Sequence, residues 1–260
     1  MNRLYCIPSL EQLGDFLEFS EKYQAGFEYN DFYMPDLLDD SAAIQRIIKG
    51  YLDTGRDCSK DTLHGAFFDV CVNSSDRKIF EVSDLRVRQS MEIARKMGLC
   101  AVVFHTNYIV NFRLPFYINS WLDRNEEYWR GILRDYPEQK IFMENMFDDA
   151  PGLLAELAKR MADEERFAVC LDTAHALISG SPLATWLSGL KPYVKHVHIN
   201  DNNGREDLHQ PVGSGSFSWD IYDQWVRSFR QKPSVLVEVR GVKDLQRSIK
   251  YMEENHIYPF

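Results

Sequence analysis

The strongest constraint on the fold is a regular alternation of short β-rich segments with longer segments of helical periodicity. Strands are expected where β-branched, aromatic and other apolar residues cluster, and helices where apolar residues recur every three or four positions. The expected strands cover residues 3–7, 26–29, 62–72, 100–105, 140–144, 167–172, 194–199 and 234–239. The expected helices cover residues 10–23, 42–52, 83–97, 121–133, 150–162, 183–190, 219–229 and 242–254. Strict alternation of this kind implies a parallel sheet with crossover helices.

Eight repeats of strand and helix favour closure of that sheet into a (β/α)8 barrel. Such a barrel needs about 250 residues, and this chain has 260. No linker, low-complexity stretch or block of charge divides the chain, so residues 1–260 are expected to form one domain. No G-x-G-x-x-G follows the first strand, which weighs against an open dinucleotide-binding sheet. The aromatic-rich residues 107–120 are expected to form a long loop after the fourth strand, where barrel enzymes carry substrate-covering loops.

Charge and composition argue against several classes of partner. The net charge is -9, and no basic stripe suited to nucleic acid is visible. The apolar runs are far shorter than the roughly 20 residues of a membrane helix, and the N-terminal residues do not resemble a signal peptide. Five widely spaced cysteines without a C-x-x-C pair are expected to be mainly buried free thiols. These features predict a cytoplasmic protein with no membrane partner, and they weigh against a nucleic-acid partner.

Acidic and imidazole side chains recur where the expected strands end. The carboxyl ends of the strands form the active-site face of a (β/α)8 barrel, and they form a ring around one axis. Side chains from different strands can therefore point at one central position. The residues placed there or in the adjoining loops are Glu28, His64, His105, Glu144, Asp172, His175, His198, Asp201, Asp207, His209 and Glu238.

Carboxylates and imidazoles in one funnel repel or desolvate one another unless a cation lies among them. A divalent metal ion resolves that conflict, and an oxygen-rich set of two glutamates, one aspartate and one histidine suits Mn²⁺, Mg²⁺ or Co²⁺. The expected ligands are Glu144, Asp172, His198 and Glu238. Additional imidazoles favour Zn²⁺ and a second metal. These are His64, His105, His175 and His209.

Three polar residues also have structural interpretations. For Glu28 a structural role is as well supported as a functional one, and Asp201 is suited to capping the loop after its strand. His196 is interpreted as alternating with His198 along the strand, which would turn it away from the axis and into the helix layer. His196 is therefore expected to be structural.

The same residues make the chain resemble the xylose isomerase-like barrel superfamily, which includes sugar (phosphate) isomerases, epimerases and endonuclease IV. The resemblance spans nearly the whole chain. It is carried by GFEYN at 26–30, LHGAF at 63–67, VVFH at 102–105, IFMEN at 141–145, CLDTAH at 170–175, HVHINDNNG at 196–204, DLHQPVGSG at 207–215 and VLVEV at 235–239.

Resemblance to the ketose epimerases of that superfamily implies one catalytic metal held by Glu144, Asp172, His198 and Glu238. The two glutamates would also be the acid and base, and His175 would contact the substrate. Such chemistry is physically reasonable, because a metal that chelates adjacent sugar oxygens offsets the charge of a cis-enediolate. A carboxylate on each face can then remove a proton and return it elsewhere.

Resemblance to endonuclease IV implies a larger, three-zinc phosphodiesterase site. The first zinc would be held by His64, His105 and Glu144, the second by the four residues above, and the third by His175, Asp207 and His209. The acidic net charge opposes that activity, because a phosphate backbone needs a basic groove. The loop after Glu28 carries Asp31 in place of the basic or amide side chains that such a groove needs, and the stretch after His64 also departs from that family.

The leading interpretation is a metal-dependent isomerase or epimerase of a small sugar, sugar phosphate or polyol ketone. A dehydratase or lyase on a similar substrate, an abasic-site endonuclease and a non-catalytic sugar-binding barrel are the alternatives. Self-association of the chain is left open. Further residues expected to contact a substrate are Glu28, Phe67, Arg205 and Trp219, and the cations available for a phosphate are Arg113, Arg205 and Arg240.

Overall fold

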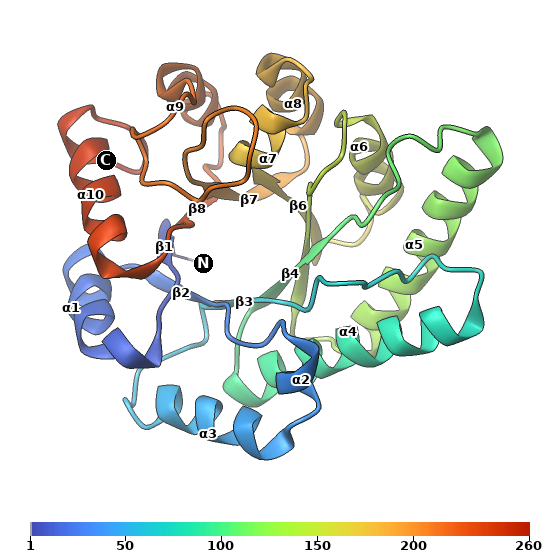
Figure 1. Ribbon diagram of the computed structural model, residues 1–260, viewed down its shortest axis with the longest axis horizontal. Helices are drawn as coiled ribbons and strands as arrows, with labels where there is room; N and C mark the ends of the chain where they lie inside the picture. The colour runs from blue at the N-terminus through green and yellow to red at the C-terminus, as the bar shows by residue number, and fades with distance from the viewer. Residues whose placement is uncertain (1) are drawn as a thin grey trace.

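The computed structural model describes residues 2–260 and has a closed barrel of eight parallel strands. Each strand pairs with the next in sequence, and β8 closes the ring against β1. Figure 1 shows the helices arranged around this ring. The strands are β1 (Leu4–Cys6), β2 (Gly26–Tyr29), β3 (Thr62–His64), β4 (Ala101–His105), β5 (Lys140–Glu144), β6 (Phe167–Asp172), β7 (Val194–Ile199) and β8 (Ser234–Val237). The predicted (β/α)8 barrel is confirmed.

The helices occupy the segments between strands, as a barrel of parallel strands requires. The longer ones are α1 (Leu13–Tyr23), α3 (Ser41–Leu52), α4 (Arg77–Met97), α5 (Pro115–Asp135), α6 (Gly152–Arg160), α8 (Leu183–Leu190), α9 (Trp219–Arg227) and α10 (Gly241–Glu254). Three short elements are the 3-10 helix η1 (Leu10–Gln12), α2 (Pro35–Leu38) and α7 (Thr173–Ile178). No helix among residues 2–260 combines the length and apolar character needed to cross a membrane.

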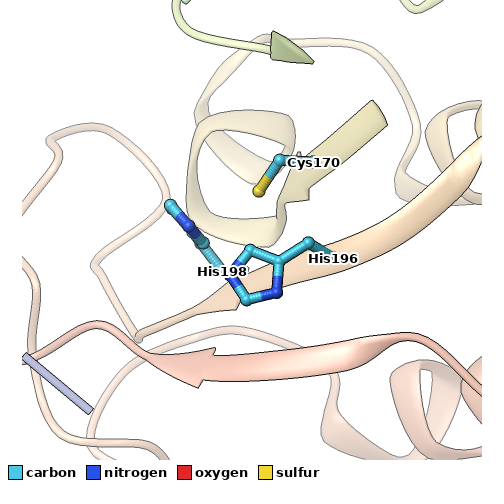
Figure 2. Close-up of side chains that lie close together, drawn as sticks. All are labelled: Cys170, His196 and His198. Atoms are coloured by element: carbon cyan, nitrogen blue, oxygen red, sulfur yellow. The ribbon is translucent and has the colours of Figure 1, made fainter. Parts of the chain in front are cut away.

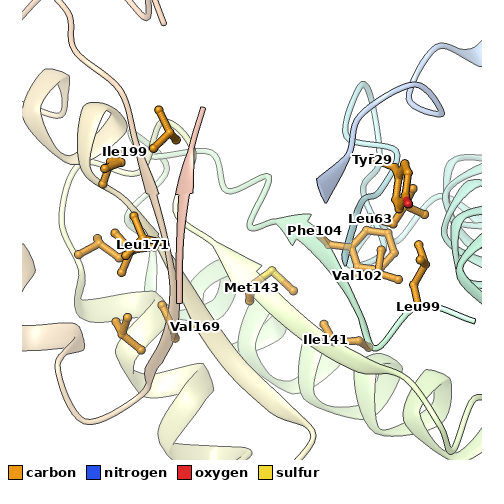
Figure 3. Close-up of a cluster of buried hydrophobic side chains, with 14 of the residues drawn as sticks. Tyr29, Leu63, Leu99, Val102, Phe104, Ile141, Met143, Val169, Leu171 and Ile199 are labelled. Atoms are coloured by element: carbon orange, nitrogen blue, oxygen red, sulfur yellow. The ribbon is translucent and has the colours of Figure 1, made fainter. Parts of the chain in front are cut away.

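Alternation along the strands divides the apolar core into two clusters. On β4, Ala101 and Val103 face the barrel interior, together with residues of β5 and β6. The intervening Val102 and Phe104 point outward and belong to the large cluster beneath the helices. Figure 3 shows part of this outer cluster, with side chains of β2 to β7. The same alternation continues to the strand ends, so His105, Glu144 and Asp172 point into the barrel like Val103, Phe142 and Cys170 before them.

Three predicted boundaries were wrong by six residues or more, and a local feature accompanies each. The expected strand at 62–72 ends at His64, and the next residue, Gly65, packs so closely on the Phe104 ring that an added Cβ would lie 2.4 Å from a ring carbon. The expected loop at 107–120 ends early, because Pro115 begins α5 with its fixed φ. Helix α4 begins six residues before the predicted start, where the Asp76 carboxylate accepts hydrogen bonds from two backbone N–H groups.

Candidate metal centre

Four side chains from consecutive strands converge inside the carboxyl end of the barrel. Glu144, Asp172 and His198 lie at or near the ends of β5, β6 and β7, and Glu238 follows β8 directly. Each offers one ligand atom, and these four atoms all lie within 4.8 Å of one another. The Nδ1 atom of His198 lies 3.3 Å from Oε2 of Glu144 and 3.5 Å from Oε2 of Glu238. The structure therefore gathers the four predicted ligands at one position.

The donor set fits a divalent cation. Oε2 of Glu144, Oδ2 of Asp172, Nδ1 of His198 and Oε2 of Glu238 are all buried without a hydrogen-bond partner in the described chain. Leaving one buried polar atom unpaired costs about 1–3 kcal/mol, and charged groups cost more. Four such atoms facing a common position are explained by an ion that accepts their lone pairs.

The electrostatics of the three carboxylates differ. Burial raises the pKa of Glu144, but the His198 and His105 imidazoles outweigh burial and hold it well below its ordinary value. Burial also acts on Glu238, where His209 and His198 lower the pKa to about 2. For Asp172, burial and the neighbouring Glu238 and Glu144 carboxylates raise the pKa to about 7, against the lowering effect of His175. A bound cation would favour the ionised form of all three.

The Asp172 side chain has two separate tasks. Its Oδ1 atom accepts the backbone N–H of His175 at 2.6 Å and so caps α7, leaving Oδ2 for the central position. The side chain of Asn145, which sequence reasoning did not select, bonds both the N–H and the carbonyl of Asp172. It thereby ties the end of β5 to the end of β6. Its only signal was its position beside Glu144 in IFMEN.

A second group shares Glu144. Oε2 of Glu144 lies 3.6 Å from Nε2 of His64 and 3.4 Å from Nε2 of His105, and the three residues can supply atoms within 4.8 Å of one another. Nδ1 of His64 faces the carbonyl of Gly65 at 3.0 Å, so this ring donates from Nδ1 and keeps a lone pair on Nε2. Both ring nitrogens of His105 lack a hydrogen-bond partner in the described chain. This geometry suits a second metal ion.

A third cluster lies at the outer edge of the site. Nδ1 of His175 faces the carbonyl of Asn145 at 2.9 Å, and Nδ1 of His209 faces the carbonyl of Glu238 at 3.1 Å. Both Nε2 atoms then approach the same Asp207 oxygen, at 3.3 and 3.2 Å. Two neutral rings held in this way would present lone pairs to a carboxylate. Either protonation of the rings or a cation resolves that conflict.

Protonation has support from the charges around these rings. Burial lowers the pKa of His209, but Glu238 and Asp207 outweigh burial and raise it to about 10. Burial also lowers the pKa of His175, but Asp172 and Asp207 outweigh burial and raise it well above its ordinary value. The surrounding carboxylates therefore favour the protonated form of both rings when no metal is bound.

The expected direction of His196 was wrong. Residues two apart on a strand share a face, so His196 points into the barrel with His198, where it is fully buried. Figure 2 shows both rings beside the Cys170 side chain. These three residues can also offer atoms within 4.8 Å of one another. The ring nitrogens of His196, however, already face Ser234 at 2.7 Å and Glu28 at 3.2 Å, so this group is poorly suited to a metal.

A cavity of about 590 Å³ opens above the metal position, and it reaches residues of all three clusters. Its aromatic wall includes Phe67, with Tyr33 stacked on it at 5.2 Å between ring centroids. Sequence reasoning missed Tyr33, Asn30, Met146 and Phe147, which also line the cavity. Arg240 lines its rim and is exposed.

The other expected substrate residues lie elsewhere. Glu28 is buried beneath the site, and Arg205 is exposed on the loop after β7, outside the cavity lining. Trp219 is buried, and its Nε1–H donates to Asp201 at 3.0 Å. Asp201 also accepts the backbone N–H groups of Asn202, Gly213 and Phe217, so it organises this loop as expected. Arg113 forms an ion pair with Asp149 and lines a different surface groove.

Curated relatives include both uncharacterised proteins and nucleases. The chain is 25% identical over 203 residues to uncharacterized protein MJ1311 of Methanocaldococcus jannaschii, covering 74% of this chain and 68% of that protein. It is 30% identical over 118 residues to a probable endonuclease 4 of Protochlamydia amoebophila, which covers only 39% of this chain and 42% of that protein.

Solved structures share the fold over almost the whole chain. The TTHB071 protein of Thermus thermophilus, from a crystal soaked with ZnCl2, has a TM-score of 0.75 at 21% identity, covering 97% of both chains. A D-tagatose 3-epimerase-like protein also scores 0.75 at 21% identity, over 97% of this chain and 96% of that one. A D-psicose 3-epimerase scores 0.69 at 14% identity, over 97% and 99%.

The family model described as xylose isomerase-like TIM barrel matches residues 17–255, which is most of the chain. That match agrees with the closed eight-stranded barrel and with the inward polar residues at its strand ends. The chain therefore belongs to the xylose isomerase-like TIM barrel family.

Proposed function

We propose that this protein is a divalent-metal-dependent isomerase or epimerase of a small sugar or polyol ketone. The observation that carries the proposal is the convergence of four unpartnered, buried ligand atoms from Glu144, Asp172, His198 and Glu238, two of which, Glu144 and Glu238, also line the cavity. Similarity to sugar 3-epimerases of the same fold supports it. A bound divalent metal would supply Lewis-acid stabilisation of negative charge on the oxygens of a ketose.

The protein's own carboxylates would move the proton. Glu144 and Glu238 come from different strands and reach the common position from different sides of the barrel, as an acid and base on opposite faces of a sugar require. One carboxylate would take the proton from the carbon beside the carbonyl, which leaves an enediolate. The other glutamate would enter the step as a carboxylic acid. Transfer of its proton to the same carbon would give the epimer, and transfer to the former carbonyl carbon, with loss of the hydroxyl proton from the first carbon, would give the isomer. His175, in the cavity wall, would bond a substrate oxygen.

The cavity favours a neutral sugar over a phosphorylated one. Among the described residues that line it, Arg240 is the one arginine or lysine, and it lies exposed at the rim. A phosphate group is usually held by several donors converging on it. The aromatic side chains Tyr33, Phe67, Phe68 and Phe147 instead offer apolar faces suited to the C–H faces of a sugar.

An endonuclease-like phosphodiesterase is the second candidate. It is favoured by the two further clusters, His64 and His105 with Glu144, and His175 and His209 with Asp207. A local similarity to a probable endonuclease 4 also supports it. The net charge of -9 opposes it, because phosphate contacts dominate nucleic-acid affinity. A dehydratase or lyase would use the same residues as the epimerase.

Two assays distinguish these functions. Protein purified without added metal should contain bound Mn, Co or Zn by elemental analysis, and a metal-free protein without measurable affinity would remove the proposal. The loaded protein should then convert at least one member of a ketose panel, with solvent deuterium entering the product carbon. Nicking of a duplex with one abasic site, without turnover of any ketose, would select the second candidate.

A further inference from the structure

Glu28 is a buried carboxylate that the proposed reaction leaves without a task. It lies on β2, outside the strands that carry the four ligands, and its exposure is 0%. It does not line the cavity above the metal position. Burying an ionised carboxylate costs several kcal/mol unless partners compensate, so the groups that surround it explain its presence.

The Glu28 carboxylate joins two imidazoles. Its Oε1 atom lies 3.0 Å from Nε2 of His198, and neither atom has a hydrogen-bond partner among residues 2–260, so each is the nearest polar atom on offer to the other. Its Oε2 atom lies 3.2 Å from Nε2 of His196 and accepts the Thr62 hydroxyl at 2.7 Å. Nδ1 of His196 in turn faces the Ser234 hydroxyl at 2.7 Å. A continuous polar chain thus crosses the barrel interior below the site.

These contacts select the ring tautomers. Both oxygens of an ionised carboxylate accept hydrogen bonds and neither donates. With a metal on Nδ1, which faces Glu144 and Glu238, a neutral His198 ring must carry its proton on Nε2, the nitrogen that faces Glu28. His196 likewise carries a proton on Nε2 and accepts the Ser234 hydroxyl proton at Nδ1. In the metal-bound protein both rings would then be neutral, and each Nε2 proton would face an oxygen of Glu28.

We propose that Glu28 is a positioning residue that holds His198 with its Nδ1 lone pair aimed at the metal, and that it strengthens metal binding through this ring. A carboxylate on the far nitrogen of a ligating imidazole orients the ring and increases its basicity. The inference rests on the proposed metal site. It assigns to β2 a part in a centre whose ligands come from β5 to β8, and it replaces the expected substrate contact of Glu28.

The test compares two buried carboxylates. Glu28→Gln preserves size but removes the charge that faces His198. The control is Asp61→Asn, since Asp61 is also fully buried and bonds Arg56, Tyr29 and a backbone N–H but no imidazole. Affinity for Co²⁺ or Zn²⁺ is measured by competition with a chromophoric chelator, beside the melting temperature of each metal-free protein.

Glu28→Gln should weaken metal binding about 10- to 100-fold, while Asp61→Asn should bind within about threefold of wild type whatever its stability. Equal affinity of Glu28→Gln and wild type would overturn the inference and leave the proposed function standing. An equal loss in both variants would also overturn it, because the effect would then be general. A wild-type protein that binds no metal would instead refute the proposed function, on which the inference depends.

A measurement on the wild-type protein does not depend on folding of a variant. In the Zn²⁺-loaded protein, ¹⁵N-resolved NMR of the histidine side chains should place an exchange-protected proton on Nε2 of His198 and metal on Nδ1. A proton on Nδ1 of His198, or a freely exchanging Nε2 proton, would contradict the proposed role of Glu28.

Discussion

At the scale of single residues, Glu144 has the highest density of functional contacts in the site. Its carboxylate lies within 3.6 Å of nitrogen atoms of four histidines: His64, His105, His175 and His198. It is common to the four-residue group and to the His64 and His105 group. One carboxylate therefore belongs to two candidate metal positions, which makes it the most informative single substitution.

Glu144→Gln should keep the fold and lower turnover of the sugar substrate by about 10²- to 10⁴-fold, the usual contribution of an acid or base. The amide preserves volume but neither takes a proton nor carries charge. Steady-state kinetics with far-UV circular dichroism as the folding control would check this. Turnover within tenfold of wild type would exclude Glu144 as acid or base.

The buried carboxyl group of Asp148 should make the stability of the fold depend on pH, and Asp148 is not one of the candidate metal ligands. Burial raises its pKa from 3.8 to about 6, although Thr106 and the backbone N–H of Met146 bond the carboxylate. Because the folded protein holds this proton more tightly than the unfolded chain, its contribution is fully present below about pH 4 and is lost as pH rises through 6. The difference between a pKa of 3.8 and one of about 6 corresponds to about 3 kcal/mol.

Asp148→Asn should therefore gain stability relative to wild type as pH rises from 4 to 7, by up to about 3 kcal/mol. The asparagine oxygen can still accept both hydrogen bonds. Urea unfolding of the two proteins across this range isolates Asp148, because the other carboxyl groups titrate in both. Parallel stability curves would show that Asp148 ionises normally in the folded protein.

At the scale of elements, the helix starts depend on individual caps. The Asp76 carboxylate accepts the N–H groups of Lys78 and Ile79 at the start of α4, and Asp40 does the same for Ala42 and Ala43 at the start of α3. Helix α4 packs against β3 and β4 and so supports the strands that carry His64 and His105. Loss of such a cap costs about 1 kcal/mol.

Asp76→Ala should lower the melting temperature by about 2–4 °C, as a loss of 1 kcal/mol does in a domain of this size, and should leave metal affinity unchanged. Asp76→Asn is the matched control, because its amide oxygen can still accept both N–H groups. Differential scanning calorimetry measures the difference. If Asp76→Asn were as unstable as Asp76→Ala, the loss of stability would come from the lost charge and not from the lost cap.

At the scale of the whole molecule, the candidate metal position joins strands that are distant in sequence. Candidate ligands from four strand ends, with Glu28 on a fifth strand, lie in one barrel interior. A metal that binds only the closed barrel stabilises the folded state by mass action, by about 2.7 kcal/mol at a hundredfold excess over Kd.

Removal of metal with a chelator should therefore lower the melting temperature by several degrees, and added Zn²⁺ or Mn²⁺ should restore it. Calorimetric scans of the metal-free and reloaded protein measure this. In Glu238→Ala, which lacks one ligand, the melting temperature should respond much less to metal. An equal response in that variant would place the stabilising ion elsewhere.

The sequence by itself determined the barrel and the four residues that gather at the carboxyl end of its strands. Alternating strand and helix signals are local, and a polar residue ending an apolar strand is visible without coordinates, as with Glu144 and Asp172. Because the strand ends of a barrel meet at one face, these local signals sufficed to predict that four distant residues gather. The inward direction of His196 could also have been predicted from the sequence, because residues two apart on a strand share a face and His198 points inward. The prediction was wrong because it placed the two residues on opposite faces.

Tertiary structure decided what each polar residue faces. No local pattern separates Trp219, which bonds Asp201 in the core, from Phe67, which lines the cavity. Glu28 and His198 are far apart in the sequence, and only closure of the barrel places their side chains 3.0 Å apart. Local propensity determines where elements begin and which face is apolar, whereas contacts across the interior depend on strand register and on closure of the ring.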